Sequence, residues 1–399
     1  YVGGYRALGA GAGVRWIIGV GVPEQELMGT VRRSNYETAL IGLASVLLAV
    51  LFGMQLARRI SGPIQRLAKE TEQIAALNLE PSVLERSKLV EIDLLSTALE
   101  EMKAGLRSFQ RFVPTEVVQA TVRGGRDLSI GGERRSMTVL FADLVGFSNM
   151  TEKCRPEELV RVVNCFLEVA TGSIVSYGGT IDKYIGDAVM AFWGAPKPSE
   201  THAADACAAA LRIQSQLDDL AYALRFSGMP KPQARIGIST GDLVVGNVGS
   251  TIRLNYTVLG DHANLASRLV AINKVYGTRI LLSDTTRDAA GDGIVARPFE
   301  PVLVKGRSTE NLVYELVALR EDACDEDLEL VEVSRALLDA YLARDFEEAS
   351  AMAHRILALR PADAFARTIL DDCRAMRRGE VDDSWTGARR VVVTDGIPD

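Results

Sequence analysis

The longest uncharged stretch of the chain runs from Thr38 to Ala57. Twenty helical residues span roughly 30 Å, which matches the hydrocarbon core of a bilayer. This pattern predicts a transmembrane helix over residues 38–57, and a buried core helix is the alternative. Basic residues flank both ends, with Arg32 and Arg33 before the stretch and Arg58 and Arg59 after it. The positive-inside rule therefore favours a cytoplasmic C-terminal side only weakly.

Residues 1–37 contain an apolar run, "WIIGVGV", followed by a helical pattern. A strand that leads into a membrane helix in this way resembles the C-terminal remnant of an extracytoplasmic Cache-like sensor domain. The chain begins with Tyr1 rather than methionine, so we expect it to be a fragment of a longer protein.

Residues 58–110 carry two hydrophobic stripes with heptad spacing, separated by a connector that contains Pro81. The first stripe comprises Ile60, Ile64, Leu67, Thr71 and Ile74, and the second comprises Ile92, Leu95, Leu99, Met102, Leu106 and Phe109. Two short stripes predict a parallel helical bundle, which requires a second chain. With Pro63 soon after the membrane and Glu91 opening the second stripe, the segment resembles a HAMP signalling module. A plain coiled-coil linker is the alternative.

After a linker or transducer segment at residues 111–133, strand and helix patterns alternate over residues 134–319 and predict an α+β domain. We expect a strand that contains "MTVLFADL", followed by a helix over 156–177 and a hairpin over 180–194 that turns at Gly186. A helix over 200–224 should follow, and then a second hairpin over 235–249 that turns at Gly241 and Asp242. The next helix should start at about His262, with Asp261 as its N-cap.

The remaining residues form two segments. Residues 320–378 predict a helical hairpin followed by another helix, and they resemble one tetratricopeptide-type repeat. Because one repeat alone is too short for a solenoid, we expect it to pack against a neighbour. Residues 379–399 are polar and predict a disordered tail.

Composition narrows the classes of function. The net charge of -7 and the pI of about 5.3 argue against a surface that binds nucleic acid. The five cysteines show no CxxC spacing, and the three histidines are far apart, so no zinc motif is visible. We interpret the cysteines as reduced packing residues of a cytosolic region.

Two carboxylates interrupt apolar strand patterns. Asp143 lies within "FADLVGF", and Asp187 lies at the turn of "TIDKYIGDAVMAFWG". Burying an unpaired charge costs several kcal/mol at least, so each carboxylate needs a partner. If folding brings them together, they form a site for divalent cations, which accept one or two carboxylates and complete their shell with phosphate oxygens and water. An ion pair between Asp143 and a basic side chain is the alternative.

Asn264 and Arg268 are four residues apart on the predicted helix, so they share one face. An amide and a guanidinium presented together suit a phosphate or a ribose. A solvated polar stripe would produce the same pattern.

Taken together, four motifs over about residues 134–319 resemble the catalytic domain of the class III nucleotidyl cyclases. The motifs are "FADLVGF", "GDAVMAFWG", "NLASR" and "VKGR". The resemblance implies a ferredoxin-like βαββαβ core with an extra hairpin. It also implies that Asp143 and Asp187 hold two divalent cations, Mg²⁺ or Mn²⁺. Lys183 matches the base-reading lysine, Asn264 and Arg268 match the transition-state pair, and Lys305 matches the triphosphate-binding lysine.

Thr257 occupies the second base-reading position, where many adenylyl cyclases have aspartate and guanylyl cyclases have cysteine. A bacterial subgroup has threonine there, and guanylyl cyclases have glutamate where this chain has Lys183. Because a lysine can donate to N1 of adenine but not to the N1–H of guanine, we expect ATP as substrate. A guanylate cyclase, or a non-catalytic cyclase-like domain for nucleotide sensing or dimerisation, is the alternative.

The resemblance also implies how such an enzyme is assembled. We expect a homodimer joined through the stalk and the catalytic domain, with no nucleic-acid partner. We expect the chain to lie in the cell inner (plasma) membrane with its catalytic domain in the cytoplasm.

Overall fold

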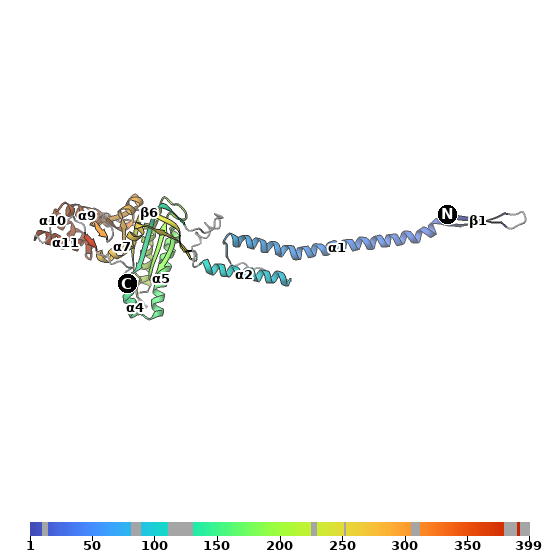
Figure 1. Cartoon of the computed structure of the whole chain (residues 1–399), viewed down its shortest axis with the longest axis horizontal. Coiled ribbons are helices and arrows are strands. Elements are labelled where there is room, and N and C mark those ends of the chain that lie inside the picture. The colour runs from blue at the N-terminus through green and yellow to red at the C-terminus, as the bar shows by residue number, and fades with distance from the viewer. Residues whose placement is uncertain are drawn as a thin grey trace. The chain divides into compact units, whose positions relative to one another are not determined.

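The computed structural model describes residues 1–9, 15–80, 89–110, 131–224, 230–250, 253–304, 312–378 and 389–391. The chain divides into two compact units, residues 1–111 and residues 112–399 (Figure 1). Each unit is described by itself.

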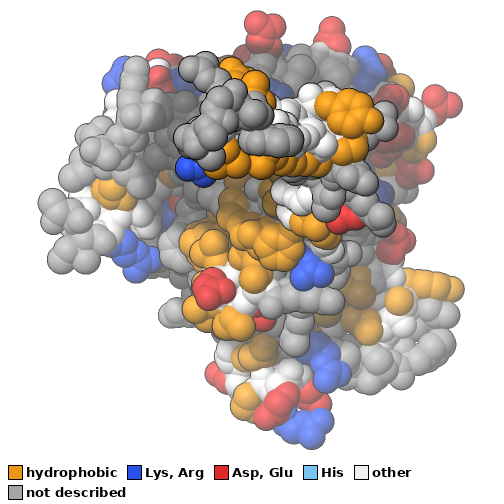
Figure 2. Space-filling model, turned by 90° about the vertical axis from the view of Figure 1, so that its right-hand side faces the viewer, with side chains coloured by type: hydrophobic (Ala, Val, Ile, Leu, Met, Phe, Trp, Pro, Cys, Tyr) orange, Lys and Arg blue, Asp and Glu red, His pale blue; other side chains and the backbone are white. Residues whose placement is uncertain are grey.

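The N-terminal unit begins with an antiparallel hairpin of β1 (Val2–Gly9) and β2 (Arg15–Val22), and a single long helix, α1 (Glu24–Ala75), follows. The predicted strand and helix are confirmed, whereas β1 was not predicted. Residues 34–75 of α1 include an apolar window long enough to cross a membrane, and none of that window is buried. Figure 2 shows, in one view of the chain, that hydrophobic side chains gather at the surface.

The HAMP-like region consists of the second half of α1 together with the helix α2 (Val90–Gln110). Part of the two heptad stripes is buried in the single chain, including Leu67 and Ile92. Other members stay exposed, among them Ile64 and Leu95, whose exposed fractions are 50% and 56%. A second copy of the bundle would cover these side chains, as the heptad spacing predicts. Residues 81–88 of the connector and the side chain of Phe109 lie outside the described residues.

The C-terminal unit, residues 112–399, contains the predicted catalytic domain and is called the catalytic unit below; it is built on a mixed sheet. Its core consists of six elements, β3 (Gly131–Leu144), α5 (Pro156–Ser176), β4 (Thr180–Ile185), β5 (Ala188–Trp193), α6 (His202–Ala223) and β6 (Ala234–Gly249). Their strands lie in the order β4-β5-β3-β6, and each neighbouring pair is antiparallel. This is the predicted ferredoxin-like βαββαβ arrangement. The short helix α4 (Phe147–Lys153) follows β3.

The sheet continues beyond β6 through β8 (Ile280–Ser283), β11 (Val313–Leu319) and β9 (Ile294–Pro298). The helix α8 (Asp284–Ala290) and a 3-10 turn over residues 291–293 connect β8 to β9. The short strands β10 (Val302–Val304) and β12 (Arg389–Val391) pair in parallel. Part of the tail predicted to be disordered is therefore a strand, because it finds a partner edge far away in sequence.

The prediction of a hairpin that turns at Gly241 and Asp242 is wrong. The strand β6 continues through both residues, because β3 is long enough to pair with it from Gly131 opposite Asn247 to Leu144 opposite Ala234. The extra hairpin is instead formed by β6 and β7 (Leu254–Leu259). The strand β3 also begins at Gly131, inside the predicted linker, and the rest of that linker, residues 111–130, lies outside the described residues.

Two layers cover the central sheet. The helices α5 and α6 pack on one face around Phe166, Ile174 and Ile213. On the other face, β7 and the helix α7 (Asp261–Tyr276) pack against Met190 and Phe192 of β5. The α5 segment is apolar and long enough to qualify as a membrane span, but its packing on the sheet makes it a core helix.

The C-terminal tail consists of α9 (Asp325–Leu342), α10 (Phe346–Leu359) and α11 (Ala364–Arg377), which lie beside α7 in Figure 1. One hydrophobic cluster joins Leu265, Leu269 and Tyr276 of α7 to Leu337 and Phe365 of the tail. The expectation that this segment packs against a neighbour is confirmed within the chain, since α7 is that neighbour.

A buried cation anchors the tail to the sheet. Arg297 of β9, only 2% exposed, forms ion pairs with Glu315 of β11 and with Asp363, which precedes α11. The distance from its Nη2 to Oδ2 of Asp363 is 2.6 Å, and its guanidinium lies 4.8 Å from the centre of the Phe299 ring. Removing the cation would leave the buried Asp363 carboxylate without an opposite charge, and Glu315 would keep only its longer ion pair with Arg360, at 3.6 Å.

We therefore expect Arg297→Ala to lower the free energy of unfolding of the catalytic unit by about 3–5 kcal/mol. The measurement is urea unfolding of the purified chain, followed by tryptophan fluorescence, since Trp193 is buried in the sheet. The matched control is Arg279→Ala, which breaks an exposed ion pair with Asp218 and should cost about 1 kcal/mol or less. Equal losses for the two variants would contradict the anchoring role.

Candidate functional site

The two predicted metal-binding carboxylates lie on neighbouring parts of the sheet. Asp143 is the last but one residue of β3 and lies opposite Arg235 of β6. Asp187 lies in the turn between β4 and β5, directly after Gly186. The φ angle of Gly186 is 62°, a left-handed conformation that favours glycine and allows the tight turn. Both aspartates are buried, with exposed fractions of 9% and 8%.

The electrostatics of this pair suit a cation. Burial raises the pKa of Asp143 to about 7, together with the hydrogen bond and the negative charge of Asp187, while the Leu144 backbone and Arg235 lower it in part. Oδ1 of Asp143 is buried and has no hydrogen-bond partner among the described residues. An orphaned oxygen beside a second carboxylate fits the binding of a divalent cation. No third acidic, histidine or cysteine ligand joins them in the described part of the chain, so phosphate and water would complete the shell.

The two predicted base-reading residues come into contact although they are far apart in sequence. Lys183 of β4 donates a hydrogen bond to Oγ1 of Thr257 on β7 over 3.3 Å. The strand β7 reaches β4 because it folds over the β4–β5 hairpin, where Tyr256 packs near Phe192 with ring centres 6.1 Å apart. Thr257 is buried, and Lys183 is half-buried.

A third residue at this contact was not predicted. The Asp182 side chain is 1% exposed and accepts a hydrogen bond from the Thr257 hydroxyl at Oδ2. The Lys183 ammonium lies 3.2 Å from Oδ1 of Asp182, close enough for an ion pair although its direction makes no hydrogen bond. The sequence could have indicated Asp182, because it is a carboxylate within an apolar strand pattern, as Asp143 is.

Asn264 and Arg268 lie one turn apart on α7, as predicted. The Asn264 side chain is exposed and that of Arg268 is half-exposed. The helix lies close to the sheet, because a Cβ at Gly237 of β6 would come within 2.2 Å of the Ala266 carbonyl oxygen. Asp261 is the first helical residue rather than the N-cap, and Gly260 takes the N-cap position. Lys305, the predicted triphosphate-binding residue, lies outside the described residues.

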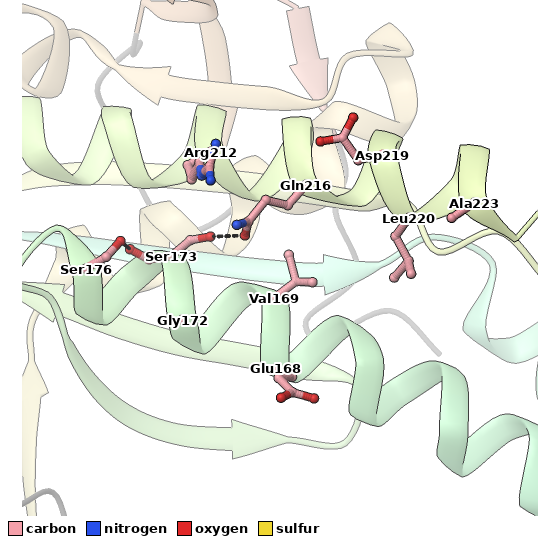
Figure 3. Close-up of a pocket in the computed structure, with 10 residues that line it drawn as sticks. All are labelled: Glu168, Val169, Gly172, Ser173, Ser176, Arg212, Gln216, Asp219, Leu220 and Ala223. Atoms are coloured by element: carbon pink, nitrogen blue, oxygen red, sulfur yellow. Dashed lines mark hydrogen bonds between the residues drawn. The ribbon is translucent and has the colours of Figure 1, made fainter.

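A groove between α5 and α6 is separate from these residues (Figure 3). Ser173 and Gln216 meet across it in a hydrogen bond of 2.9 Å, and Glu168, Arg212 and Asp219 line it. None of the predicted site residues lines this groove. The candidate chemistry therefore lies at the β4–β5 hairpin, the end of β3, β7 and α7.

Comparisons with known proteins match two segments of the chain to known families. The family described as "Adenylate and Guanylate cyclase catalytic domain" matches residues 132–317, and the family described as "HAMP domain" matches residues 55–108. The chain is similar to Adenylate cyclase 1 of Rhizobium meliloti (strain 1021), with 32% identity over 75% of this chain and 45% of that protein. It is also similar to the adenylate cyclase of Anabaena cylindrica, with 30% identity over 75% of this chain and 62% of that protein.

The chain is also similar to a solved structure. The crystal structure of the adenylyl cyclase CyaB from P. aeruginosa shares 33% identity, over 49% of this chain and 100% of that chain, with a TM-score of 0.45. The chain spans less than two thirds of the length of the curated relatives named above.

Proposed function

Because the chain belongs to the class III adenylate and guanylate cyclase family and carries a HAMP domain, we propose that it is a membrane-bound adenylate cyclase. It converts ATP to 3′,5′-cyclic AMP and pyrophosphate. The observation that carries the choice of substrate is the contact between Lys183 and Thr257. The two curated relatives named above bear the name adenylate cyclase, which agrees with this choice.

The base-reading pair favours adenine on chemical grounds. The edge of adenine presents an acceptor at N1 and a donor at its amino group. The Lys183 ammonium is a donor only, so it can bind N1 of adenine and cannot bind the N1–H of guanine. A buried polar group left unpaired by the wrong base costs about 1–3 kcal/mol, enough to discriminate between the two nucleotides.

Asp143 and Asp187 would hold two divalent cations, Mg²⁺ or Mn²⁺, since both are buried carboxylates and Oδ1 of Asp143 has no hydrogen-bond partner in the part of the chain that the structure describes. When bound, such ions supply Lewis-acid chemistry, which lowers the pKa of the 3′-hydroxyl and neutralises charge on the phosphates. The contribution of the chain is to fix one carboxylate on the strand β3 and the other in the tight turn between β4 and β5, so that the charged ligands are in place before ATP binds.

The remaining residues act on the ribose and the phosphates. The 3′-hydroxyl of ATP attacks its own α-phosphorus, a P–O bond forms, and the bond to pyrophosphate breaks. Asn264 orients the ribose, and Arg268 neutralises the charge that grows on the α-phosphoryl oxygens. Lys305 steadies the leaving pyrophosphate, a role that stays a prediction from the sequence. We assign the proton of the hydroxyl to no protein base.

The proposed enzyme works as a homodimer at the cell inner (plasma) membrane, with its catalytic domain in the cytoplasm. The apolar part of α1 is exposed, which supports its role as a membrane anchor. Several members of the heptad stripes are also exposed, which supports a dimer in which a second copy of the chain covers them. Since the HAMP domain lies in sequence between the proposed membrane anchor and the cyclase domain, we propose that it carries a regulatory signal along the stalk.

We expect the purified chain to form cyclic AMP from ATP, and to use GTP at a rate lower by about tenfold or more, given the cost of an unpaired base edge. The measurement supplies ATP or GTP with Mg²⁺ or Mn²⁺ and identifies each product by chromatography and mass. Cyclic GMP as the main product would replace the proposal by a guanylate cyclase. Nucleotide binding without any cyclic product, in either metal, would favour a non-catalytic sensing or dimerisation domain.

A further inference from the structure

The strand β4 is irregular at Asp182. Ile181 lies opposite Ala191 of β5, and Lys183 lies opposite Met190, so Asp182 has no partner of its own. Such a β-bulge places an extra residue in one strand and redirects the side chains beside it. In a regular strand, Ile181 and Lys183 would share one face, because successive side chains alternate.

The bulge brings two charged side chains to one face. Ile181 packs toward α5 and α6, whereas Met190, the neighbour of Lys183, packs toward β7. Lys183 therefore leaves the face of Ile181 and reaches Thr257, and Asp182 reaches the same threonine. Burying the Asp182 carboxylate costs free energy. Its hydrogen bond from Thr257 and its ion pair with Lys183 offset that cost, since a buried charge is tolerated only when it is paired and hydrogen-bonded.

We propose that Asp182 is a positioning residue that sets the preference for ATP by fixing the direction of the Thr257 hydroxyl. A carboxylate can only accept, so the Thr257 hydrogen points to Asp182. The lone pairs of Oγ1 are then left for donors, namely Lys183 and the amino group of adenine. Guanine presents a carbonyl oxygen at that place, and two acceptors would face each other. This inference rests on the proposed adenylate cyclase function.

The test is Asp182→Asn, measured as the ratio of kcat/KM for ATP to kcat/KM for GTP. In the variant, Lys183 keeps the amide oxygen on its own side, so the amide N–H₂ faces Thr257 and donates to it. The threonine hydrogen becomes free to bind the guanine carbonyl. We expect the ratio to fall by about tenfold or more, on the scale of one buried mispaired polar group. The ratio does not depend on the folded fraction, because both substrates meet the same molecules.

Matched variants separate this role from a structural one. Thr257→Ser keeps the hydroxyl and its bond to Asp182, so the ratio should stay within about twofold, since the polar groups stay paired. Asp218→Asn, at an exposed carboxylate that pairs with Arg279, should also leave the ratio unchanged. If Asp182→Asn does not accumulate, Asp182→Ala tests the same point, because it also removes the obligatory acceptor.

The outcomes distinguish the inference from the function on which it rests. The double variant Lys183→Glu, Thr257→Cys serves as the positive control, because it places the residues of guanylyl cyclases at both base-reading positions and should lower the preference for ATP over GTP. If the unmodified chain makes no cyclic AMP, the proposed function fails. If the unmodified chain prefers ATP and the double variant loses that preference, while both Asp182 variants keep the original ratio, the positioning role alone is overturned.

Discussion

Replacing Asp143 or Asp187 by alanine is expected to reduce cyclic nucleotide formation by about a hundredfold to a thousandfold, the scale seen when a group that stabilises transition-state charge is lost. The two carboxylates are buried, and among the described residues one oxygen of Asp143 has no hydrogen-bond partner. Each variant would lose one of the two protein ligands proposed to hold the metal ions. The measurement is the initial rate of product formation at saturating ATP with Mg²⁺ and with Mn²⁺.

The same variants should remain folded. The pKa of Asp143 is raised from its ordinary value to about 7, so the native carboxyl holds its proton more tightly than the unfolded one. Stability from this group is therefore present at low pH and is lost as the pH rises from about 4 to about 7. At pH 8 and without metal, Asp143→Ala should unfold at the same temperature as the unmodified chain or at a higher one, because a buried like-charge pair has been removed.

A binding measurement completes this test. Ligands that bind the native state raise its stability, by about 2.7 kcal/mol at a hundred times their Kd. Mg²⁺ with an unreactive ATP analogue should therefore raise the unfolding temperature of the unmodified chain and have little effect on either variant. Asp218→Ala, at an exposed carboxylate, is the control and should behave as the unmodified chain in both assays. A variant at Asp143 or Asp187 that keeps more than about a tenth of the activity would refute the metal assignment, since a lost ligand costs far more.

The elements that the sequence predicted correctly are those with strong local signals. The helices α5, α6 and α7 follow clear apolar periodicity, and the β4–β5 hairpin follows from Gly186 between two apolar runs. The aspartates were found because a charge in an apolar strand needs a reason. Such signals depend on a few neighbouring residues, so they survive without knowledge of the rest of the fold.

The errors arose where distant pairing decides the local structure. Gly241 and Asp242 carry a turn signal, yet they lie inside β6, because β3 offers a partner along its whole length. Gly241 serves another need, since a Cβ there would come within 2.2 Å of the His262 ring. The strand β12 likewise depends on pairing with β10, far away in sequence, and the bulge at Asp182 depends on the register of β4 against β5. The local sequence pattern predicts neither.

Co-expression of Asp143→Ala with Asn264→Ala is expected to restore activity to about a quarter of the unmodified level, by symmetry counting. The resemblance to the class III cyclases implies an active site between two catalytic domains, one of which supplies the metal aspartates and the other the remaining residues. The proposed site residues of this chain include both sets, so a two-fold homodimer should contain two equivalent sites. Each variant alone damages both sites of its homodimer and should be inactive.

The contacts within one chain agree with this division. Lys183 joins Thr257 and Asp182, while Asp187, only four residues further on, joins Asp143 at the end of β3. The β4–β5 hairpin thus presents one set of residues along its strand and the other at its turn. The exposed heptad residues of α1 and α2 supply an independent reason to expect parallel dimers.

The activity recovered on co-expression distinguishes a site shared between two chains from a site contained in one chain. With random pairing, about half of the dimers are heterodimers, and each has one intact site and one doubly damaged site. The assay is cyclic AMP formation after co-expression with two different affinity tags, which isolate the heterodimer, so that its activity should approach about half of the unmodified level by the same count. Co-expression of Asp143→Ala with Asp187→Ala is the matched control, because both changes fall in the same set and leave no intact site. Heterodimers of Asp143→Ala and Asn264→Ala that are isolated and remain inactive would place the whole site within one chain.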